Sequence, residues 1–319
     1  MSVIVVSWNT RDHLAACLAT IGPAADGLSL ETCVVDNGSA DGSADLVAMR
    51  CPEARLVRNH ENRGFAAAVN QGLAATTARH ALLLNPDARL PAGGLRTLVE
   101  WGDAHADVGI VGAALRDPDG RAQKSVAAEP SLATELLNRD LLRFLAPQAF
   151  PDAQMGGEPR DVPSVIGACL LARRAAIEAV GPLDEGFFVF LEETDWCVRM
   201  RAAGWRVVHH PGVVVEHAQG AAARRTPVAK WIEYHRSLYR FFRKHRGLAS
   251  YVVLRAARPL KLAVNLALNG LVLALTLGLA SRARRKVRVN AGLCWWHLRG
   301  CPAAMGLRRV GPATARPSV

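Results

Sequence analysis

Short apolar runs alternate with helix-like segments along the first hundred residues. The apolar runs are too short for helices, whereas the segments between them carry apolar residues at helical spacing, as at Leu14, Leu18 and Ile21. This alternation is typical of a parallel sheet with crossover helices packed on its faces. The predicted strands are 3–7, 32–35, 54–58 and 80–84, and the predicted helices are 11–21, 43–49, 65–75 and 95–105.

Three of these predicted strands end in polar clusters, at 8–10, 36–39 and 85–87. Ligands of open α/β sheets bind beyond the carboxyl ends of the parallel strands, so the clusters indicate one binding edge. A carboxylate at Asp36 suits hydrogen bonds from a base or ribose, and one at Asp87 suits a divalent metal with oxygen ligands. Each cluster taken alone also fits a simple turn.

The elements after residue 117 are less regular. Residues 118–163 are proline-rich, with one helical island at 132–145. Strands are predicted at 165–171, 207–209 and 213–215, and a helix at 193–203 ends at Gly204, a residue that commonly follows helices. The short aromatic run at 187–191 precedes that helix directly.

Three carboxylates follow the aromatic run. Glu192, Glu193 and Asp195 adjoin apolar surface, which raises the pKa of a carboxyl group and suits it to act as a general base. Acids in the first turn of a helix also favour its dipole, and this purely structural role is an equal alternative. His217 ends the last predicted strand and gains interest only in combination with Asp87.

Cysteine usage and the amino terminus indicate the compartment. The seven cysteines are odd in number and none has Cys-x-x-Cys spacing, so we expect reduced thiols in a cytoplasmic protein, with no disulfide framework or zinc ribbon. The apolar run at 3–7 lacks a preceding basic region and is too short for a signal peptide.

Charge divides the chain into two parts. Residues 1–220 hold 19 Lys and Arg against 27 Asp and Glu, a net charge of −8, whereas residues 221–319 hold 20 basic residues and one acid, Glu233, a net charge of +19. We therefore expect two parts, a globular domain over 1–222 and a basic, helical C-terminal region over 223–319. Such a region requires a polyanionic partner, either anionic lipid or nucleic acid.

Two segments of this region have membrane-like patterns. Residues 262–280 carry no charge and would reach ~28 Å as a helix, close to the ~30 Å hydrocarbon core. Basic residues flank both ends, which favours a re-entrant or interfacial segment over a single span. Residues 230–246 predict a basic interfacial helix, with packing on the acidic domain as the alternative. Its apolar face holds Trp231, Tyr234, Leu238, Phe241 and Phe242.

Six short motifs occur in a recognisable order between residues 2 and 217. Together they resemble the family-2 glycosyltransferases with a GT-A fold, most closely the rhamnosyltransferase-like members. The resemblance implies a mixed, mainly parallel α/β sheet flanked by helices. The motifs are Val5-Val6-Ser7-Trp8-Asn9, Val35-Asp36-Asn37-Gly38-Ser39, Asn62-Arg63-Gly64-Phe65-Ala66, Asn85-Pro86-Asp87, Gly167-Ala168-Cys169-Leu170-Leu171 and Glu192-Glu193-Thr194-Asp195-Trp196.

The resemblance implies a nucleotide side and a metal site. Asn85-Pro86-Asp87 stands where the family has Asp-x-Asp, with Asp87 on Mg²⁺ or Mn²⁺ and Asn85 near the ribose. His217 is similar to a downstream metal-binding histidine of related galactofuranosyltransferases. Asp36 is expected at the nucleobase. The other nucleotide-side residues are Val6 and Ser7, which line the base pocket, and Asn9, Asn62 and Arg63.

The resemblance also implies an acceptor side and a base. The family's acidic motif reads Glu-Asp-x-Asp, so Glu193 stands in the base position with a longer side chain than usual. The choice of base between Glu193 and Asp195 therefore stays open. The acceptor-side residues are Gly167, Ala168, Glu192 and Trp196.

The implied activity is inverting, metal-dependent transfer of a sugar, expected to be rhamnose, in cell-envelope polysaccharide synthesis. The expected donor is a dTDP- or UDP-sugar, and the expected acceptor is a glycan or a lipid-linked glycan. We expect action at the cytoplasmic face of an anionic membrane, with peripheral or re-entrant attachment and a single span as the alternative. A nucleic-acid-binding protein and an inactive sugar-nucleotide-binding module are the competing functions. The uncharged stretch favours lipid over nucleic acid, and the retained acids argue against an inactive module.

Overall fold

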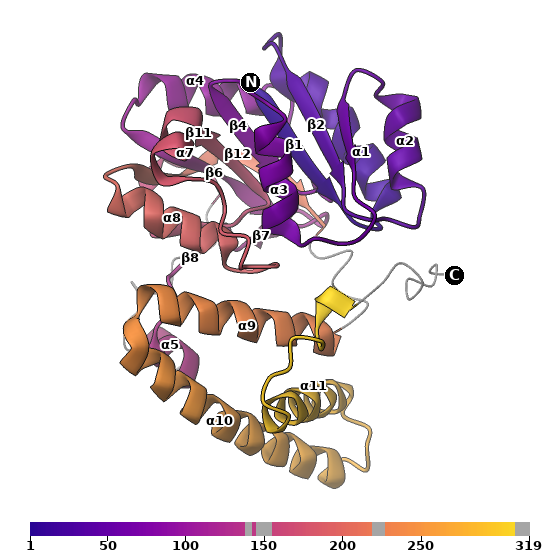
Figure 1. The fold of residues 1–319 in the computed structure, drawn as a ribbon, viewed down its shortest axis with the longest axis vertical. Coiled ribbons are helices and arrows are strands. Elements are labelled where there is room, and N and C mark those ends of the chain that lie inside the picture. The colour runs from indigo at the N-terminus through magenta and orange to yellow at the C-terminus, as the bar shows by residue number, and fades with distance from the viewer. Residues whose placement is uncertain (138–141, 145–154, 219–226, 310–319) are drawn as a thin grey trace.

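The molecule has two parts in the computed structural model, which describes residues 1–137, 142–144, 155–218 and 227–309 (Figure 1). An α/β domain surrounds a central sheet, and three long C-terminal helices lie together beyond one end of it. The predicted boundary between the two parts, at 222, falls within 219–226, outside the described residues.

A mixed sheet forms the centre of the α/β domain, in the order β3-β2-β1-β4-β11-β6-β12-β5, with β7 paired to β6 and β9 to β12. Strands β1, β2, β3 and β4 run parallel, β12 is parallel to β6, and β11 and β5 are antiparallel to their neighbours. The predicted mixed, mainly parallel α/β architecture is therefore confirmed. The strands are β1 Ser2–Ser7, β2 Glu31–Asp36, β3 Arg55–Arg58, β4 His80–Leu84, β5 Ala88–Arg89, β6 Val108–Arg116, β7 Ala122–Gln123, β9 Arg160–Asp161, β11 Cys169–Arg173 and β12 Arg206–His217.

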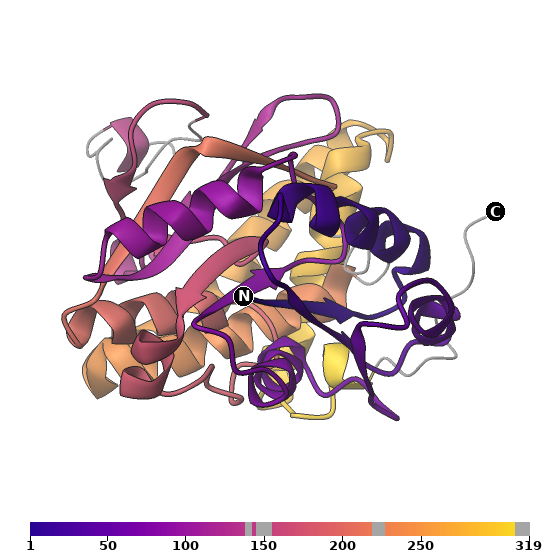
Figure 2. The ribbon, with the colours of Figure 1, turned by 90° about the horizontal axis from the view of Figure 1, so that it is seen from above.

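Helices cover both faces of this sheet, as the view from above shows (Figure 2). Along β1, Val3 and Val5 pack into one core and Ile4 and Val6 into the other, because successive side chains of a strand point to opposite faces. Burial of both faces explains why these strands are continuous apolar runs. One face carries α1 Arg11–Ala25, α2 Ser43–Arg50 and α4 Gly94–Ala104; the other carries α3 Phe65–Ala74, α7 Arg174–Val180 and α8 Glu192–Ala202.

Several elements differ from the prediction. Strand β6 and helix α7 were not predicted, and the two strands expected at 207–209 and 213–215 are one bulged strand, β12. Helix α5, Leu132–Leu136, begins the predicted island at 132–145, much of which falls outside the described residues. Strand β10, Ser164–Val165, pairs with β8, Val126–Ala127, in a separate small sheet.

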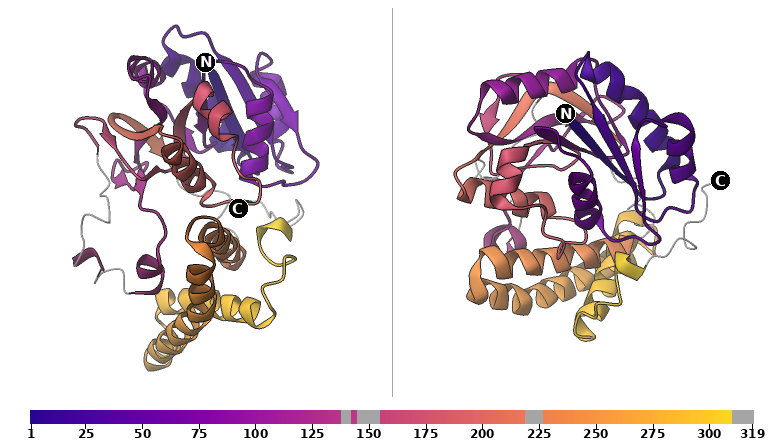
Figure 3. Two further views of the ribbon diagram at one scale, coloured as in Figure 1. Left: turned by 60° about the vertical axis from the view of Figure 1, so that its left-hand side comes forward. Right: turned by 45° about the horizontal axis from the view of Figure 1, so that its top comes forward.

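The C-terminal helices are α9 Pro227–His245, α10 Gly247–Leu275 and α11 Ser281–Leu298, followed by a short 3₁₀ turn, η3 Leu307–Arg309. Helix α9 lies against the α/β domain, and α10 and α11 lie on the side of α9 that faces away from that domain (Figure 3). Leu238, Phe241 and Phe242 are buried in a core that includes Phe187. The expectation that the apolar face of 230–246 meets a membrane is therefore wrong, and the alternative of packing on the acidic domain is confirmed.

The basic charge of this region has partners within the chain. Asp184 forms ion pairs with Arg240 and Lys244. Two further acids of the α/β part also form ion pairs with this region: Glu135 with Arg258, and Glu129 with Arg246. Part of the positive charge of the C-terminal region is thus paired with acids of the α/β domain. Sequence alone cannot distinguish these internal acidic partners from an external polyanion.

Candidate functional site

Three polar positions meet where the parallel strands end. The register aligns Ser7 of β1 with Asp36 of β2, and Val5 with Leu84 of β4, the residue before Asn85. Strand β1 starts at the amino terminus and runs toward the helical layer (Figure 1), so the predicted binding edge faces that layer. Residues of three separate motifs are therefore neighbours in the fold.

Asp36 presents a carboxylate oxygen that lacks a partner among the described residues. Its Oδ2 accepts the backbone N–H of Ser39 at 3.1 Å, whereas Oδ1 is inaccessible to solvent and accepts no hydrogen bond. A buried acceptor without a donor is costly, which makes it a candidate for a ligand's N–H or O–H group. Ser7 and Val6 are buried beside it at the end of β1.

Asn37 connects the loops around this carboxylate. Its Nδ2 donates to Asn62 Oδ1 at 2.9 Å and to the Gly64 carbonyl at 3.1 Å, while its Oδ1 accepts the backbone N–H of Arg63. Asn9 Oδ1 accepts the backbone N–H of Ala40 at 2.8 Å. Asn9 and Asn62 therefore shape the loops, whereas the Arg63 side chain is exposed. Sequence reasoning placed all three on the nucleotide side and missed Asn37, whose amide contacts both Asn62 and the Arg63 backbone.

The two predicted metal residues are brought together from distant parts of the chain. Strand β12 pairs with β5 so that His217 lies opposite Ala88, and the backbone N–H of Ala218 donates to the Asp87 carbonyl at 3.0 Å. His217 Nε2 then lies 3.3 Å from Asp87 Oδ1, with both side chains less than a tenth exposed. Asn85 Nδ2 lies 3.4 Å from the same nitrogen.

This pair fits a divalent cation. Ligand atoms on one ion, each ~2.1 Å from it at about a right angle, stand about 3 Å apart, close to the observed separation. An imidazole nitrogen and a carboxylate oxygen are also common ligands for such ions. The described residues contain no group of three or more His, Cys, Asp and Glu side chains arranged for a metal, so the remaining ligands would come from substrate and water.

Glu193 is the acid best suited to take a proton. Its Oε2 is inaccessible to solvent and has no hydrogen-bond partner among the described residues. Burial raises the pKa of Glu193, against the smaller opposing effects of the Gly167 backbone and of Lys124. Glu192 is also buried, and burial together with the charge of Glu193 holds its pKa well above the ordinary value. Two adjacent acids that resist ionisation are typical of a site that handles protons.

Asp195 has a different environment. Its side chain is fully buried, and its carboxylate contacts Arg199 at 2.9 Å, Lys244 at 2.7 Å and His245 at 2.7 Å. Burial alone raises the pKa of Asp195, but the hydrogen bonds from His245 and Lys244 outweigh it and lower the pKa. A carboxylate stabilised by three close partners is a poor base, in contrast to Glu193, whose Oε2 has no hydrogen-bond partner among the described residues.

A short path of contacts joins Glu193 to the Asp87–His217 pair. The backbone N–H of Asn85 donates to the Ala168 carbonyl at 2.9 Å, and the neighbouring Gly167 lies against the side chain of Glu193. A β-carbon on Gly167 would stand 3.5 Å from that of Glu193. Gly167 and Ala168 thus bridge the two predicted groups.

The last predicted acceptor-side residue has a core position. Trp196 is fully buried among the residues of α7, α8 and β12, and its indole N–H donates to the Gly181 carbonyl at 3.0 Å. Direct contact with an acceptor is incompatible with this burial. Its burial next to Asp195 anchors the acidic helix α8 in the core.

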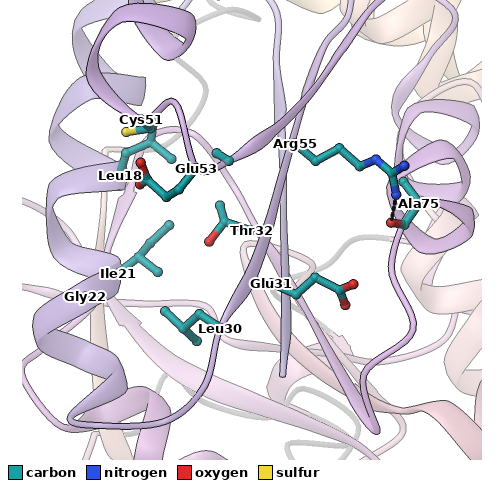
Figure 4. Close-up of a pocket in the computed structure, with 11 residues that line it drawn as sticks. Leu18, Ile21, Gly22, Leu30, Glu31, Thr32, Cys51, Glu53, Arg55 and Ala75 are labelled. Atoms are coloured by element: carbon teal, nitrogen blue, oxygen red, sulfur yellow. Dashed lines mark hydrogen bonds between the residues drawn. The ribbon is translucent and has the colours of Figure 1, made fainter.

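A cavity of about 520 Å³ opens elsewhere, between α1, the start of β2 and β3 (Figure 4). Its lining includes Leu18, Glu31, Glu53 and Arg55, none of which belongs to a predicted site. Glu31 accepts hydrogen bonds from Ser2 and from the backbone of Thr77, so its charge is already satisfied. This cavity lies apart from the carboxyl ends of the strands, where the candidate residues meet.

Known proteins share both the sequence pattern and the fold. The chain is 29% identical over 263 residues to an N-acetylglucosaminyl-diphospho-decaprenol L-rhamnosyltransferase of Mycobacterium tuberculosis, covering 77% of this chain and 85% of that protein. The structure of a mannosyltransferase of Pyrobaculum calidifontis with GDP-Man and Mn²⁺ is 21% identical, has a TM-score of 0.56, and aligns over 93% of this chain and 86% of its own.

A second solved structure, GalNAc-T7 with UDP, GalNAc and Mn²⁺, is 15% identical with a TM-score of 0.50, over 74% of this chain and 47% of its own. These two likenesses identify the fold as GT-A-like. The model of the family described as "Glycosyl transferase family 2" matches residues 2–181, more than half of the chain. The chain belongs to glycosyl transferase family 2.

Proposed function

We propose that this protein is an inverting glycosyltransferase that moves a deoxyhexose, L-rhamnose, from a dTDP donor to a lipid-linked N-acetylglucosaminyl diphosphate. The observation that carries the proposal is the convergence at one edge of the sheet of Asp36, the Asp87–His217 pair and Glu193. The rhamnosyltransferase of Mycobacterium tuberculosis, aligned over most of both chains, supports the choice of sugar and acceptor.

The residues divide the chemistry between them. The free Oδ1 of Asp36 accepts a hydrogen bond from the nucleotide, which fixes the donor at the ends of β1 and β2. Glu193 takes the proton of the acceptor hydroxyl, and that oxygen attacks the anomeric carbon while the bond to the diphosphate breaks. Attack from the face opposite the leaving group inverts the configuration. A Mg²⁺ or Mn²⁺ ion held by Asp87 and His217 would neutralise the leaving diphosphate.

The test is transfer by the purified full-length protein. Incubation with dTDP-L-rhamnose, Mg²⁺ and a synthetic N-acetylglucosaminyl diphosphate lipid should release dTDP and give a product one rhamnose heavier, whose anomeric configuration NMR reports. UDP-glucose, UDP-galactose and GDP-mannose are the comparison donors. Excess EDTA should abolish transfer, and added Mn²⁺ should restore it. Retention of configuration, or turnover undiminished by EDTA, would contradict the proposed mechanism.

We also propose that the turn between α10 and α11 attaches the protein to the cytoplasmic face of an anionic membrane. Helix α10 is long and apolar enough to cross a bilayer by length and composition, and its apolar window is only 6% buried. At the turn, Leu277 and Leu279 are 90% and 80% exposed. Four exposed basic side chains at the start of α11 have no acid within ion-pair distance among the described residues: Arg282, Arg285, Lys286 and Arg288.

Vesicle binding tests this attachment. Each basic residue near an anionic surface contributes ~1 kcal/mol, so replacing all four by Gln should weaken binding to phosphatidylglycerol vesicles by about 100-fold or more. The matched control replaces Arg11, Arg50, Arg63 and Arg121, which lie in the α/β domain, and should bind like the wild type. Release by alkaline carbonate would support an interfacial turn, whereas resistance to carbonate would support a span. Equal binding of both variants, or tighter binding to RNA than to vesicles, would refute the membrane proposal.

A further inference from the structure

Gln123 contacts His217 through both ends of its amide. It lies on β7, which pairs with β6 so that Gln123 stands opposite Leu115, beside the strand that leads to His217. Gln123 Nε2 donates to the His217 carbonyl at 2.7 Å, and Gln123 Oε1 lies 3.2 Å from His217 Nδ1. Neither the sequence motifs nor the proposed function uses this residue.

The pairing places a proton on Nδ1 of His217. A carbonyl oxygen accepts but never donates, so the amide end that faces the His217 carbonyl must be the NH₂ group. The amide oxygen then faces Nδ1, and it too can only accept, so Nδ1 must carry the proton. In a neutral imidazole the other nitrogen is then bare, and Nε2 directs a lone pair toward Asp87 Oδ1 at 3.3 Å.

We infer that Gln123 is a positioning residue that holds His217 in its metal-binding tautomer. This inference rests on the proposed function, because it assumes that Asp87 and His217 hold the divalent ion. A bare nitrogen and a carboxylate oxygen facing each other repel, and a cation shared between them removes that repulsion. Gln123 therefore prepares the pair for the ion before it arrives. Partners of this kind typically contribute 10- to 100-fold to metal affinity.

The neighbouring Ser125 supplies a matched control. Its hydroxyl accepts the backbone N–H of Leu115 at 2.8 Å and donates to the Gln123 carbonyl at 3.0 Å. Ser125→Ala therefore loosens the same hairpin without touching His217. An effect of Gln123 that came only from the hairpin's stability would appear in Ser125→Ala as well.

The experiment measures Mn²⁺ affinity by EPR in the presence of dTDP, and the tautomer of His217 by ¹⁵N NMR without metal. Gln123→Met, which keeps the length but neither polar end, should weaken Mn²⁺ binding by about 10- to 100-fold and move the proton toward Nε2. Gln123→Glu keeps an acceptor for Nδ1–H and should recover the wild-type tautomer. Ser125→Ala should retain both the wild-type affinity and the wild-type tautomer.

His217→Ala distinguishes a failure of the role of Gln123 from a failure of the metal site itself. If His217→Ala weakens Mn²⁺ binding and Gln123→Met does not, the role of Gln123 is refuted while the metal site stands. If His217→Ala also leaves Mn²⁺ binding unchanged, the metal assignment in the proposed function fails, and the inference with it. An unchanged His217 tautomer in Gln123→Met, or equal losses in Gln123→Met and Ser125→Ala, would likewise overturn the role of Gln123.

Discussion

Removing the charge of Glu193 should affect activity, whereas removing the charge of Asp195 should affect stability. Glu193→Gln removes a buried carboxylate whose ionisation is opposed by its surroundings. Asp195→Asn removes a buried carboxylate that Arg199, Lys244 and His245 stabilise. The first variant should lose activity and keep its stability, and the second should lose stability.

The size of the Asp195 effect follows from its partners. Removing one member of a buried ion pair costs about 3–5 kcal/mol of unfolding free energy. In Asp195→Asn, Lys244 still pairs with Asp184 at 2.8 Å, and Arg199 still donates to the carbonyls of Val180 and Pro182. We therefore expect a loss at the lower end of that range, about 3 kcal/mol. Unfolding of 319 residues carries an entropy of about 0.67 kcal/mol/K, so the melting temperature should fall by about 4–5 °C.

The pH dependence has opposite signs in the two variants. The folded-state pKa of Glu193 is raised above the ordinary 4.5, so its ionisation reduces stability as pH rises through that window. Glu193→Gln should therefore match the wild type near pH 4 and melt at or above the wild-type temperature near pH 8. The pKa of Asp195 is lowered, so its contribution is present at neutral pH and is lost as pH falls through the folded-state pKa. The deficit of Asp195→Asn should shrink correspondingly in acid.

The assay combines calorimetric melting at several pH values with single-turnover transfer. Glu193→Gln should slow transfer by about 10²–10⁴-fold with unchanged dTDP binding. Glu178→Gln, an exposed acid on α7, is the control and should change neither quantity. If Asp195→Asn slows transfer to that extent at an unchanged melting temperature, while Glu193→Gln remains active, Asp195 is the base and the reasoning from burial is refuted.

Two further substitutions test the nucleotide side. Asp36→Ala should weaken dTDP binding by about 10-fold or more, the loss of a hydrogen bond to a charged group, as measured by calorimetric titration; unchanged affinity would remove Asp36 from the donor site. Gly64→Ala should destabilise the protein by about 1–3 kcal/mol, because Gly64 has a φ of +90° and a β-carbon there would stand 2.6 Å from the Phe188 carbonyl oxygen. A melting temperature equal to that of the wild type would show that the loop containing Phe188 moves aside without cost.

The first four strands and their helices could be predicted because each is a short local pattern. Buried parallel strands are apolar throughout, and β4 was predicted with its observed bounds, His80–Leu84. Strand β6 was overlooked although it is buried along eight of its nine residues. Its two glycines and two alanines weaken the apolar signal, and Gly112 is required because a β-carbon there would stand 2.5 Å from the Val165 side chain.

The candidate site was partly predictable for the same reason. Asp36 and Asp87 follow local strand patterns, whereas His217 reaches Asp87 only through the pairing of β12 with β5, across more than a hundred residues. Gln123 gave no signal, because an isolated glutamine on a two-residue strand resembles any other surface amide. The roles of Lys244 and His245 were hidden by the excess of positive charge around them.

The triple contact at Asp195 also bears on the order in which the protein is made. His245 follows Asp195 by 50 residues, so the ribosome synthesises helix α8 well before Lys244 and His245, which contact its Asp195. Domains generally fold in sequence as they emerge, and the α/β domain would at first hold a buried acid that contacts Arg199 but still lacks its contacts with Lys244 and His245. Helix α9 completes that domain late in biosynthesis. Maturation of the acidic helix is therefore coupled to the arrival of the helices proposed to attach the enzyme to its membrane.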